Sequence, residues 1–204
     1  MVALAFLAAA RVLGGHLVHV IVLAAWVLAV VTVLAWPSAR DGAAPGSGRR
    51  GAWLQGAALG LFVAAATHLA VAPDHFREWW LFGLFFLGVS AAQLSMGALL
   101  LSKPSRRLVL AATVASGAVV VLWAWTRLVG IPLGPTAGTT EPFGVLDVMA
   151  STAELVTVVC GAVALTSRGV GASWRWSSWS GPMRSALFAA SAVVVVALAA
   201  APKG

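Results

Sequence analysis

The chain has 204 residues, of which 61% are hydrophobic and only 9% are charged. A water-soluble domain carries roughly 25% charged residues, so this composition excludes an ordinary soluble protein and makes lipid the solvent for most of the chain. The net charge of +7 comes from short basic clusters between apolar runs, which is typical of the loops of membrane proteins and excludes a nucleic-acid-binding face.

Six apolar runs are long enough to cross a bilayer, whose hydrocarbon core of about 30 Å needs about 20 residues of helix. They predict an all-α, polytopic membrane protein with a single membrane domain over residues 1–204. In chain order, the expected spans cover about 15–36, 53–72, 78–101, 107–129, 143–166 and 185–201.

The segments between these runs are rich in Pro and Gly. Ala72-Pro73-Asp74 predicts a tight turn after the second span, with Asp74 placed to cap the third span. Residues 130–144, GIPLGPTAGTTEPFG, predict a longer loop. Residues 1–13 lack the basic start of a signal peptide. They are expected to form an interfacial or extended lead-in, and an uncleaved start-transfer role for the first span is equally consistent with them.

The basic residues between the spans indicate the orientation, because cytoplasmic loops are rich in Lys and Arg. One side collects nine of the thirteen: Arg40, Arg49, Arg50, Lys103, Arg106, Arg107, Arg168, Arg175 and Arg184. The other side collects four: Arg11, Arg77, Arg127 and Lys203. The first side is therefore expected to be cytoplasmic, with both termini outside (N-out/C-out), in what we expect to be a bacterial plasma membrane.

All four histidines map to the non-cytoplasmic end. His19 and His68 each lie about 6 Å inside the expected span edge, from the helical rise of 1.5 Å per residue. His16 precedes His19 by three residues and shares its face. His75 and Glu78 open the third span after the Pro73 turn, which should return them towards His68. These five residues, His68, His19, His16, His75 and Glu78, form a candidate metal or haem site.

The fifth span carries a second candidate site. Asp147, Ser151 and Glu154 are spaced i, i+4, i+7, so they form one stripe on one helix face. A carboxylate as deep as Glu154 is costly in lipid, so the stripe should face the bundle interior and Glu154 should have a partner. Gln93, a bound cation or protonation could serve, whereas Arg127 should reach Asp147 but not Glu154.

A ridge of small residues on the second span predicts close helix packing. Gly56, Gly60, Ala64 and His68 follow each other at intervals of four. His68 continues the ridge, so it should point at a helix and not at lipid. Gly88 and Ala92 repeat the small spacing beside Gln93.

Structural explanations compete with each of these sites. His16 and His19 are also compatible with a place among lipid headgroups, and His75 and Glu78 with solvated groups at a helix start. Asp147 and Glu154 could form purely structural hydrogen bonds. Cys160, the single cysteine, should pack as a small hydrophobe.

Two segments resemble a group of small multi-pass membrane proteins of actinobacteria and other bacteria. The first, His68 to Leu94, has a His-x6-His pair followed by a helix rich in Trp, Gly and Phe that carries Gln93. The second, Thr126 to Glu154, has an Arg-x-x-Gly-x-Pro-x-Gly-Pro loop followed by Glu, Asp and Glu. The resemblance implies that these segments belong together, and it assigns no activity, cofactor or catalytic residue.

Three function classes follow. The first is transition-metal or haem binding and redox chemistry at the outer face, with Cu, Fe, Zn or haem b as the cofactor. The second is a non-catalytic subunit of a larger membrane complex, with other membrane subunits or further copies of the chain as partners in the bilayer. The third is a proton-coupled carrier or relay that uses Asp147, Ser151, Glu154, Gln93 and Arg127. No familiar catalytic motif occurs, so the sequence leaves open whether the protein is an enzyme.

Overall fold

The computed structural model describes residues 49–167, 181, 183–185, 187–189 and 192. Over this part of the chain the architecture is all-helical, with four helices long and apolar enough to cross a membrane. They are α3 (Arg49–Glu78), α4 (Trp80–Ser102), α5 (Arg106–Leu128) and α6 (Val145–Thr166). These helices correspond to the four middle spans of the sequence analysis. The lead-in, the expected span at 15–36 and most of the span at 185–201 lie outside the described residues.

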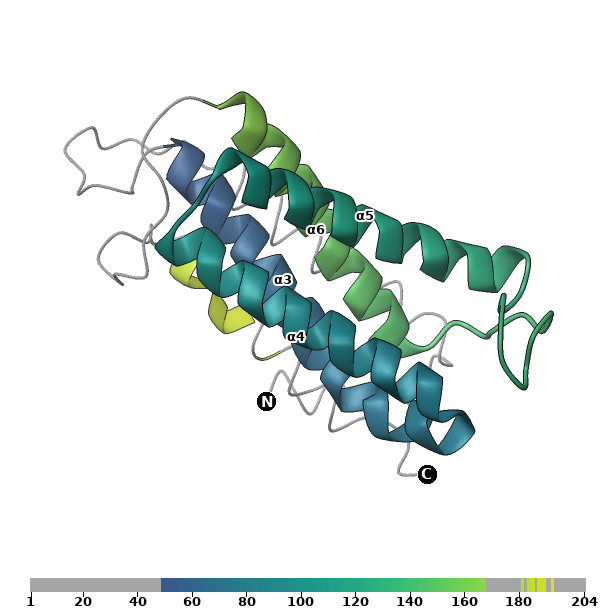
Figure 1. Ribbon diagram of the computed structural model, residues 1–204. Coiled ribbons are helices and arrows are strands. Elements are labelled where there is room, and N and C mark those ends of the chain that lie inside the picture. Colours follow the sequence, from purple (N-terminus) through teal and green to yellow (C-terminus); the bar gives the residue numbers. More distant parts are fainter. Residues whose placement is uncertain (1–48, 168–180, 182, 186, 190–191, 193–204) are drawn as a thin grey trace, which may run out of the picture.

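Helix α3 is the centre of the described bundle. It packs along α4 and along α6, and α5 packs along α6, whereas α4 and α5 barely touch each other (Figure 1). The pattern of exposure agrees, because α3 is mostly buried while α4 and α5 turn many Leu, Val and Phe side chains outwards. The face between α4 and α5 is therefore the least closely packed part of the four-helix unit.

The small-residue ridge on α3 packs against α6, as its spacing predicted. A Cβ atom at Gly56 would lie 2.9 Å from Cys160 Sγ, and one at Gly60 would lie 2.6 Å from the carbonyl oxygen of Ala153. Thr157 joins the same contact by donating from Oγ1 to the carbonyl of Ala57, at 3.3 Å. The two backbones approach closely because no side chain stands between them.

The substitution Gly60→Ala should destabilise the protein by about 1–3 kcal/mol, because the added methyl group forces α3 and α6 apart in a close-packed contact. The matched control is Gly88→Ala on α4, where an added Cβ meets nothing within 4 Å among the described residues. That substitution should be neutral or slightly stabilising, since alanine favours helix over glycine. Unfolding of the two variants in detergent measures the difference, and equal stability would contradict this packing.

The expectation that Gly88 and Ala92 form a second packing ridge is not met within the described bundle, where both residues are exposed. The close approaches on α4 are made by Gly83 against Phe76 and by Gly97 against Phe62. The two spacings point to different faces of the same helix, and the sequence did not show which face meets α3.

The predicted turn at Pro73 is wrong, because α3 continues through this proline to Glu78. Asp74 does not cap α4; its carboxylate instead pairs with Arg77 one turn later, on the exposed surface. The chain reverses at Trp79, whose extended backbone (φ −160°, ψ 130°) connects α3 directly to α4. Proline removes one backbone donor from a helix, and the remaining backbone bonds, such as the one from Trp79 N–H to the carbonyl of His75 at 2.9 Å, carry the helix past it.

Residues 129–144 connect α5 to α6, as expected for a loop, and they mark what we call the loop end of the bundle. Gly130, Gly134 and Gly138 have positive φ angles, and Ile131 and Thr139 are bridged by a backbone hydrogen bond of 2.9 Å. At Gly134 (φ +93°) a Cβ would also collide with the ring of Trp79. The loop therefore needs glycine both for its conformation and for its contact with the α3–α4 turn.

Candidate functional site

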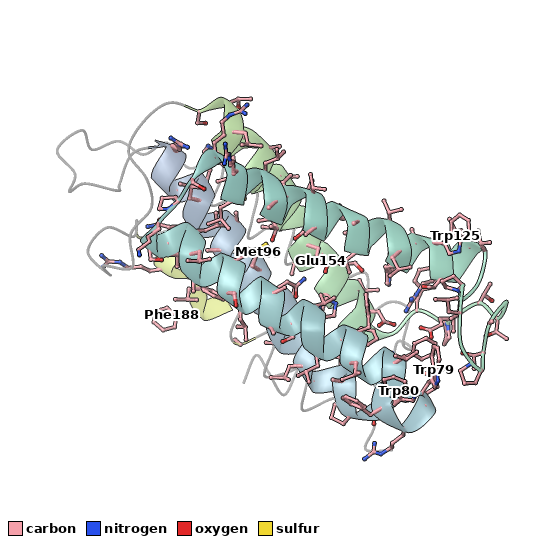
Figure 2. All side chains as sticks on the ribbon, in the orientation of Figure 1. Trp79, Trp80, Met96, Trp125, Glu154 and Phe188 are labelled. Atoms are coloured by element: carbon pink, nitrogen blue, oxygen red, sulfur yellow. The ribbon has the colours of Figure 1, made fainter. Side chains whose placement is uncertain are left out.

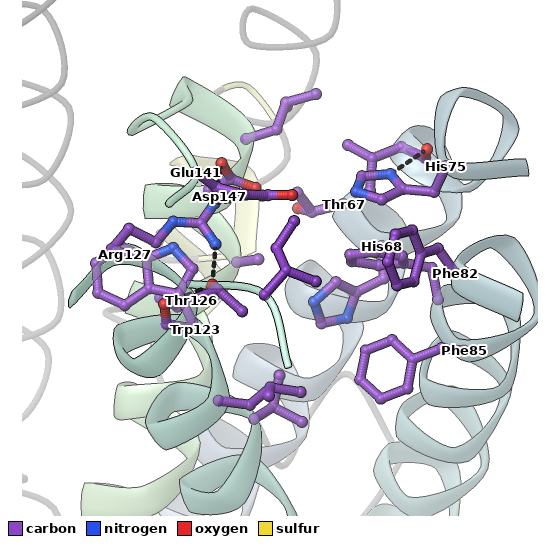
Figure 3. Close-up of a pocket in the computed structure, with 18 of the residues that line it drawn as sticks. Thr67, His68, His75, Phe82, Phe85, Trp123, Thr126, Arg127, Glu141 and Asp147 are labelled. Atoms are coloured by element: carbon purple, nitrogen blue, oxygen red, sulfur yellow. Dashed lines mark hydrogen bonds and ion pairs between the residues drawn. The ribbon is translucent and has the colours of Figure 1, made fainter. Parts of the chain in front are cut away.

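A cavity of about 380 Å³ lies at the loop end, between the four helices. Its size is within the range of small-molecule sites, roughly 300–1,000 Å³. Its walls are mainly apolar and aromatic, and its polar lining residues are Thr67, His68, His75, Thr126, Arg127, Glu141, Asp147, Ser151 and Glu154. Figure 3 shows the two histidines and the phenylalanines facing the Arg127 side chain and its acids across this space.

A chain of hydrogen bonds closes the inner end of the cavity, the end farthest from the loop. Nδ1 of His68 lies 3.0 Å from Oε1 of Gln93, and Nε2 of Gln93 donates to Oε1 of Glu154 at 2.9 Å. The three residues come from α3, α4 and α6, and all three are buried. We refer to them as the His68–Gln93–Glu154 network. Gln93 stands behind the cavity wall, whereas His68 and Glu154 line it.

The direction of these bonds defines the tautomer of His68. Because the Gln93 amide nitrogen donates to Glu154, the amide oxygen is the atom that faces His68, so Nδ1 of His68 carries a proton. In the neutral ring, Nε2 then holds the lone pair. This nitrogen lies 3.8 Å from Oε1 of Glu154, so the imidazole and the carboxyl group face each other directly as well as through the glutamine.

Glu154 has one oxygen that the network does not use. Oε2 has no hydrogen-bond partner among the described residues. It is buried, and the residue as a whole is only 1% exposed. The residue lies about 14 Å from the start of α6 at Val145, by the helical rise. Figure 2 shows it between the helices, away from the bundle end where Trp79, Trp80 and Trp125 gather. A buried acceptor without a partner is costly, so this oxygen marks a place for a proton or a ligand.

Arg127 forms the second polar group of the cavity, nearer the loop. Its side chain is only 6% exposed and lies between two acids: Nη2 is 2.6 Å from Asp147 Oδ2 and 3.4 Å from Glu141 Oε2. Nη1 also donates to Thr126 Oγ1 at 2.6 Å, and the guanidinium carbon lies 5.5 Å from the centre of the Trp123 ring. One cation therefore faces two carboxylates.

Asp147 also organises the start of α6. Its Oδ2 accepts from the backbone N–H of Gly144 at 3.2 Å, in addition to the bond from Arg127. Ser151 and Glu154 follow on the same face, and all three residues line the cavity. The prediction that this stripe faces the bundle interior is confirmed, as is the pairing of Arg127 with Asp147. Of the three alternatives for Glu154, Gln93 is a partner that the structure shows.

His75 and Glu78 do not open α4, because both belong to the end of α3. His75 lies two turns after His68 on the same side of the helix and lines the cavity, with Nδ1 donating to the carbonyl of Val71 at 2.9 Å. The ring of Phe86 contacts both histidines, at centroid distances of 5.5 Å for His68 and 4.0 Å for His75. Glu78 points elsewhere, since it accepts from Thr136 in the loop and does not line the cavity.

The described residues provide no set of three ligands for the metal interpretation. Across residues 49–167 and the short described pieces beyond them, no group of three or more His, Cys, Asp or Glu side chains could hold a metal ion. His16 and His19, two of the expected ligands, lie outside the described residues. The interpretation therefore stays a prediction.

Sequence reasoning missed two contributors to the site. Ser90, three residues before Gln93 on the same face of α4, donates to the carbonyl of Ala65 at 2.9 Å and so fixes α4 on α3. Its spacing from Gln93 was a readable signal. Phe86 gave none, because a phenylalanine in a lipid-facing helix and one in a cavity wall look alike in the sequence.

No family model, no curated protein and no solved structure matches the chain.

Proposed function

We propose that the protein is a proton-coupled membrane carrier or relay in which Glu154 and His68 bind a proton at the inner end of the cavity. One observation carries the proposal: the hydrogen bonds of the buried His68–Gln93–Glu154 network use neither Oε2 of Glu154 nor Nε2 of His68, and both residues line the cavity. Ionisable groups inside a membrane bundle are expensive to keep and commonly form proton pathways.

The geometry supports two positions for the proton. On Glu154 it makes the carboxyl group neutral, and on Nε2 of His68 it creates an imidazolium 3.8 Å from the carboxylate. Both states suit a buried site, because the first has no charge and the second pairs two opposite charges. Ser151 and Asp147 continue the polar face of α6 towards the loop, which provides a route between this site and the loop end.

Infrared spectroscopy tests the proton site without knowledge of any substrate. The difference spectrum between acidic and alkaline samples of the purified protein should contain a carboxyl band from Glu154, because protonation changes its carbonyl stretch. The band should disappear in Glu154→Gln and persist in Asp74→Asn, a matched acid-to-amide change on the exposed surface. A spectrum that is the same in Glu154→Gln and in the unaltered protein would contradict the proposal.

We further propose six spans, with both termini outside, in a bacterial plasma membrane. The described helices support this orientation, because Arg49, Arg50, Lys103, Arg106 and Arg107 occur at the ends away from the loop. Within the four described helices, Arg77 and Arg127 are the basic residues at the loop end. The positive-inside rule then makes the loop end, with its cavity, the outer one.

Thiol labelling tests this orientation. A cysteine at Thr140 should react with a membrane-impermeant reagent added to intact cells, whereas one at Lys103 should react only after the membrane is opened. Both positions are exposed on the protein, so access and not burial determines the result. The native Cys160 is buried and should contribute little background. The reverse pattern would invert the orientation.

A further inference from the structure

We infer that the cavity binds an organic cation with an aromatic or other apolar body, whose charged group lies against Glu154. The inference rests on the proposed function, since the carboxylate that binds the proton is the one that binds the cation. It names the class of co-substrate that the proposed function leaves open.

The charge of the cavity favours a cation. Its lining contains three carboxyl groups, those of Glu141, Asp147 and Glu154, and one guanidinium, that of Arg127. Arg127 already faces Asp147 and Glu141, so no unpaired positive charge remains among these four residues. Even with Glu154 protonated, the acids outnumber the arginine. An anionic ligand would therefore meet an excess of negative charge in the cavity.

The position of the unpaired acceptor places the charged group of the ligand. Oε2 of Glu154 is buried and lacks a partner among the described residues, and Glu154 is one of the residues that line the cavity. A cation there would neutralise the carboxylate and supply the missing interaction. His68 and Gln93 both lie against the other oxygen, Oε1, at 3.8 Å and 2.9 Å, so the network fixes the carboxyl group and leaves Oε2 for the ligand.

The rest of the wall suits an apolar body. Phe82, Phe85, Phe86 and Trp123 surround the space between the two polar groups. Aromatic faces attract cations, and they also pack against the ring of a ligand. Two donors near the loop, Nε1 of Trp123 and Nε of Arg127, lack partners among the described residues. They could bond a neutral acceptor at the other end of the ligand.

Binding of benzyltrimethylammonium, compared with its uncharged carbon isostere neopentylbenzene, tests the inference on the full chain in detergent. The two probes have the same shape, and the ammonium carries no proton that it could give up. Calorimetry should show saturable binding of the cation at least about tenfold tighter than that of the isostere, a ratio that corresponds to about 1.4 kcal/mol. Benzenesulfonate, an anion of similar size, should not bind. Equal affinity for cation and isostere, or preference for the anion, would overturn the inference.

Variants locate the site. Glu154→Gln should weaken binding of the cation at least about tenfold, whereas Asp74→Asn, the same chemical change on the exposed surface, should leave it unchanged. An equal loss of affinity in both variants, or no loss in either, would contradict binding of the charged group against Glu154. Should Glu154→Gln fail to fold, the comparison of the three probes on the unaltered protein still decides whether the cavity prefers a cation.

The infrared test needs no ligand, so a protein that shows the Glu154 band and fails to bind the cation would refute this inference alone. A protein that binds the cation at Glu154 and lacks the band would refute the proposed proton site.

Discussion

The triple variant His68→Leu/Gln93→Leu/Glu154→Leu should be more stable than the single variant Gln93→Leu, although it lacks three polar groups and not one. Gln93 makes two interhelical contacts, one with His68 and one with Glu154. Removing it leaves a buried donor and a buried acceptor facing a leucine. Removing all three polar side chains leaves no buried donor or acceptor of this network without a partner.

The magnitudes support this order. Polar contacts between membrane helices contribute about 0.6 kcal/mol on average and up to about 1.7 kcal/mol each, so Gln93→Leu should lose about 1–3 kcal/mol. Replacing a complete buried network by apolar groups of similar size is often neutral or stabilising. The triple variant should therefore recover most of that loss, while it loses the proton band and the binding of the cation.

Unfolding of the purified variants in mixed micelles measures this effect. Ser95→Leu provides the control, because Ser95 also lies on α4 but is exposed, and among the described residues its hydroxyl bonds the carbonyl of Ala91 in its own helix. It should change stability little. If the triple variant proves less stable than Gln93→Leu by several kcal/mol, the His68–Gln93–Glu154 network stabilises the bundle. The presence of these three buried polar residues would then need no functional explanation.

The parts of the site that depend on helix geometry alone could be predicted from the sequence. Asp147, Ser151 and Glu154 share a face because of their spacing, and a buried carboxyl group needs a partner wherever it lies. The small ridge through Gly56 and Gly60 predicts a close contact with another helix, because small residues on lipid-spanning helices permit it; only the structure shows that this helix is α6. In each case the prediction depends on the spacing of residues within one helix.

The parts that depend on how helices are rotated and bent against each other could not be predicted. The sequence predicts a break at Pro73, six residues before the reversal at Trp79. Proline weakens a helix without always ending it, and no Gly, Pro or Asn marks position 79 as a turn. Gly88 and Gly97 look equivalent in the sequence, and only the packing of α4 on α3 distinguishes them. The cavity itself results from the separation of α4 and α5, which no single segment encodes.

Arg127→Met should destabilise the protein more than Arg77→Met, although both substitutions remove an arginine at the loop end that pairs with an acid. Arg127 has a side chain only 6% exposed and neutralises Asp147 and Glu141, which are each 28% exposed. Its loss leaves two carboxylates close together without a cation. Arg77 and Asp74 are 75% and 74% exposed, and water replaces either partner.

The expected difference follows from burial. Breaking a fully buried ion pair costs about 3–5 kcal/mol. The partial exposure of the two acids reduces this, so Arg127→Met should lose about 2–3 kcal/mol. An exposed pair contributes about 0–1 kcal/mol, so Arg77→Met should lose no more than that.

Adding Asp147→Asn to Arg127→Met should restore part of the stability, because it removes one of the two unpaired charges. Asp147→Asn alone should be destabilising, since it weakens the contacts with Arg127 and with the start of α6. Thermal unfolding of the four variants measures these effects, and equal losses in Arg127→Met and Arg77→Met would show that Arg127 is not the residue that holds the loop end together.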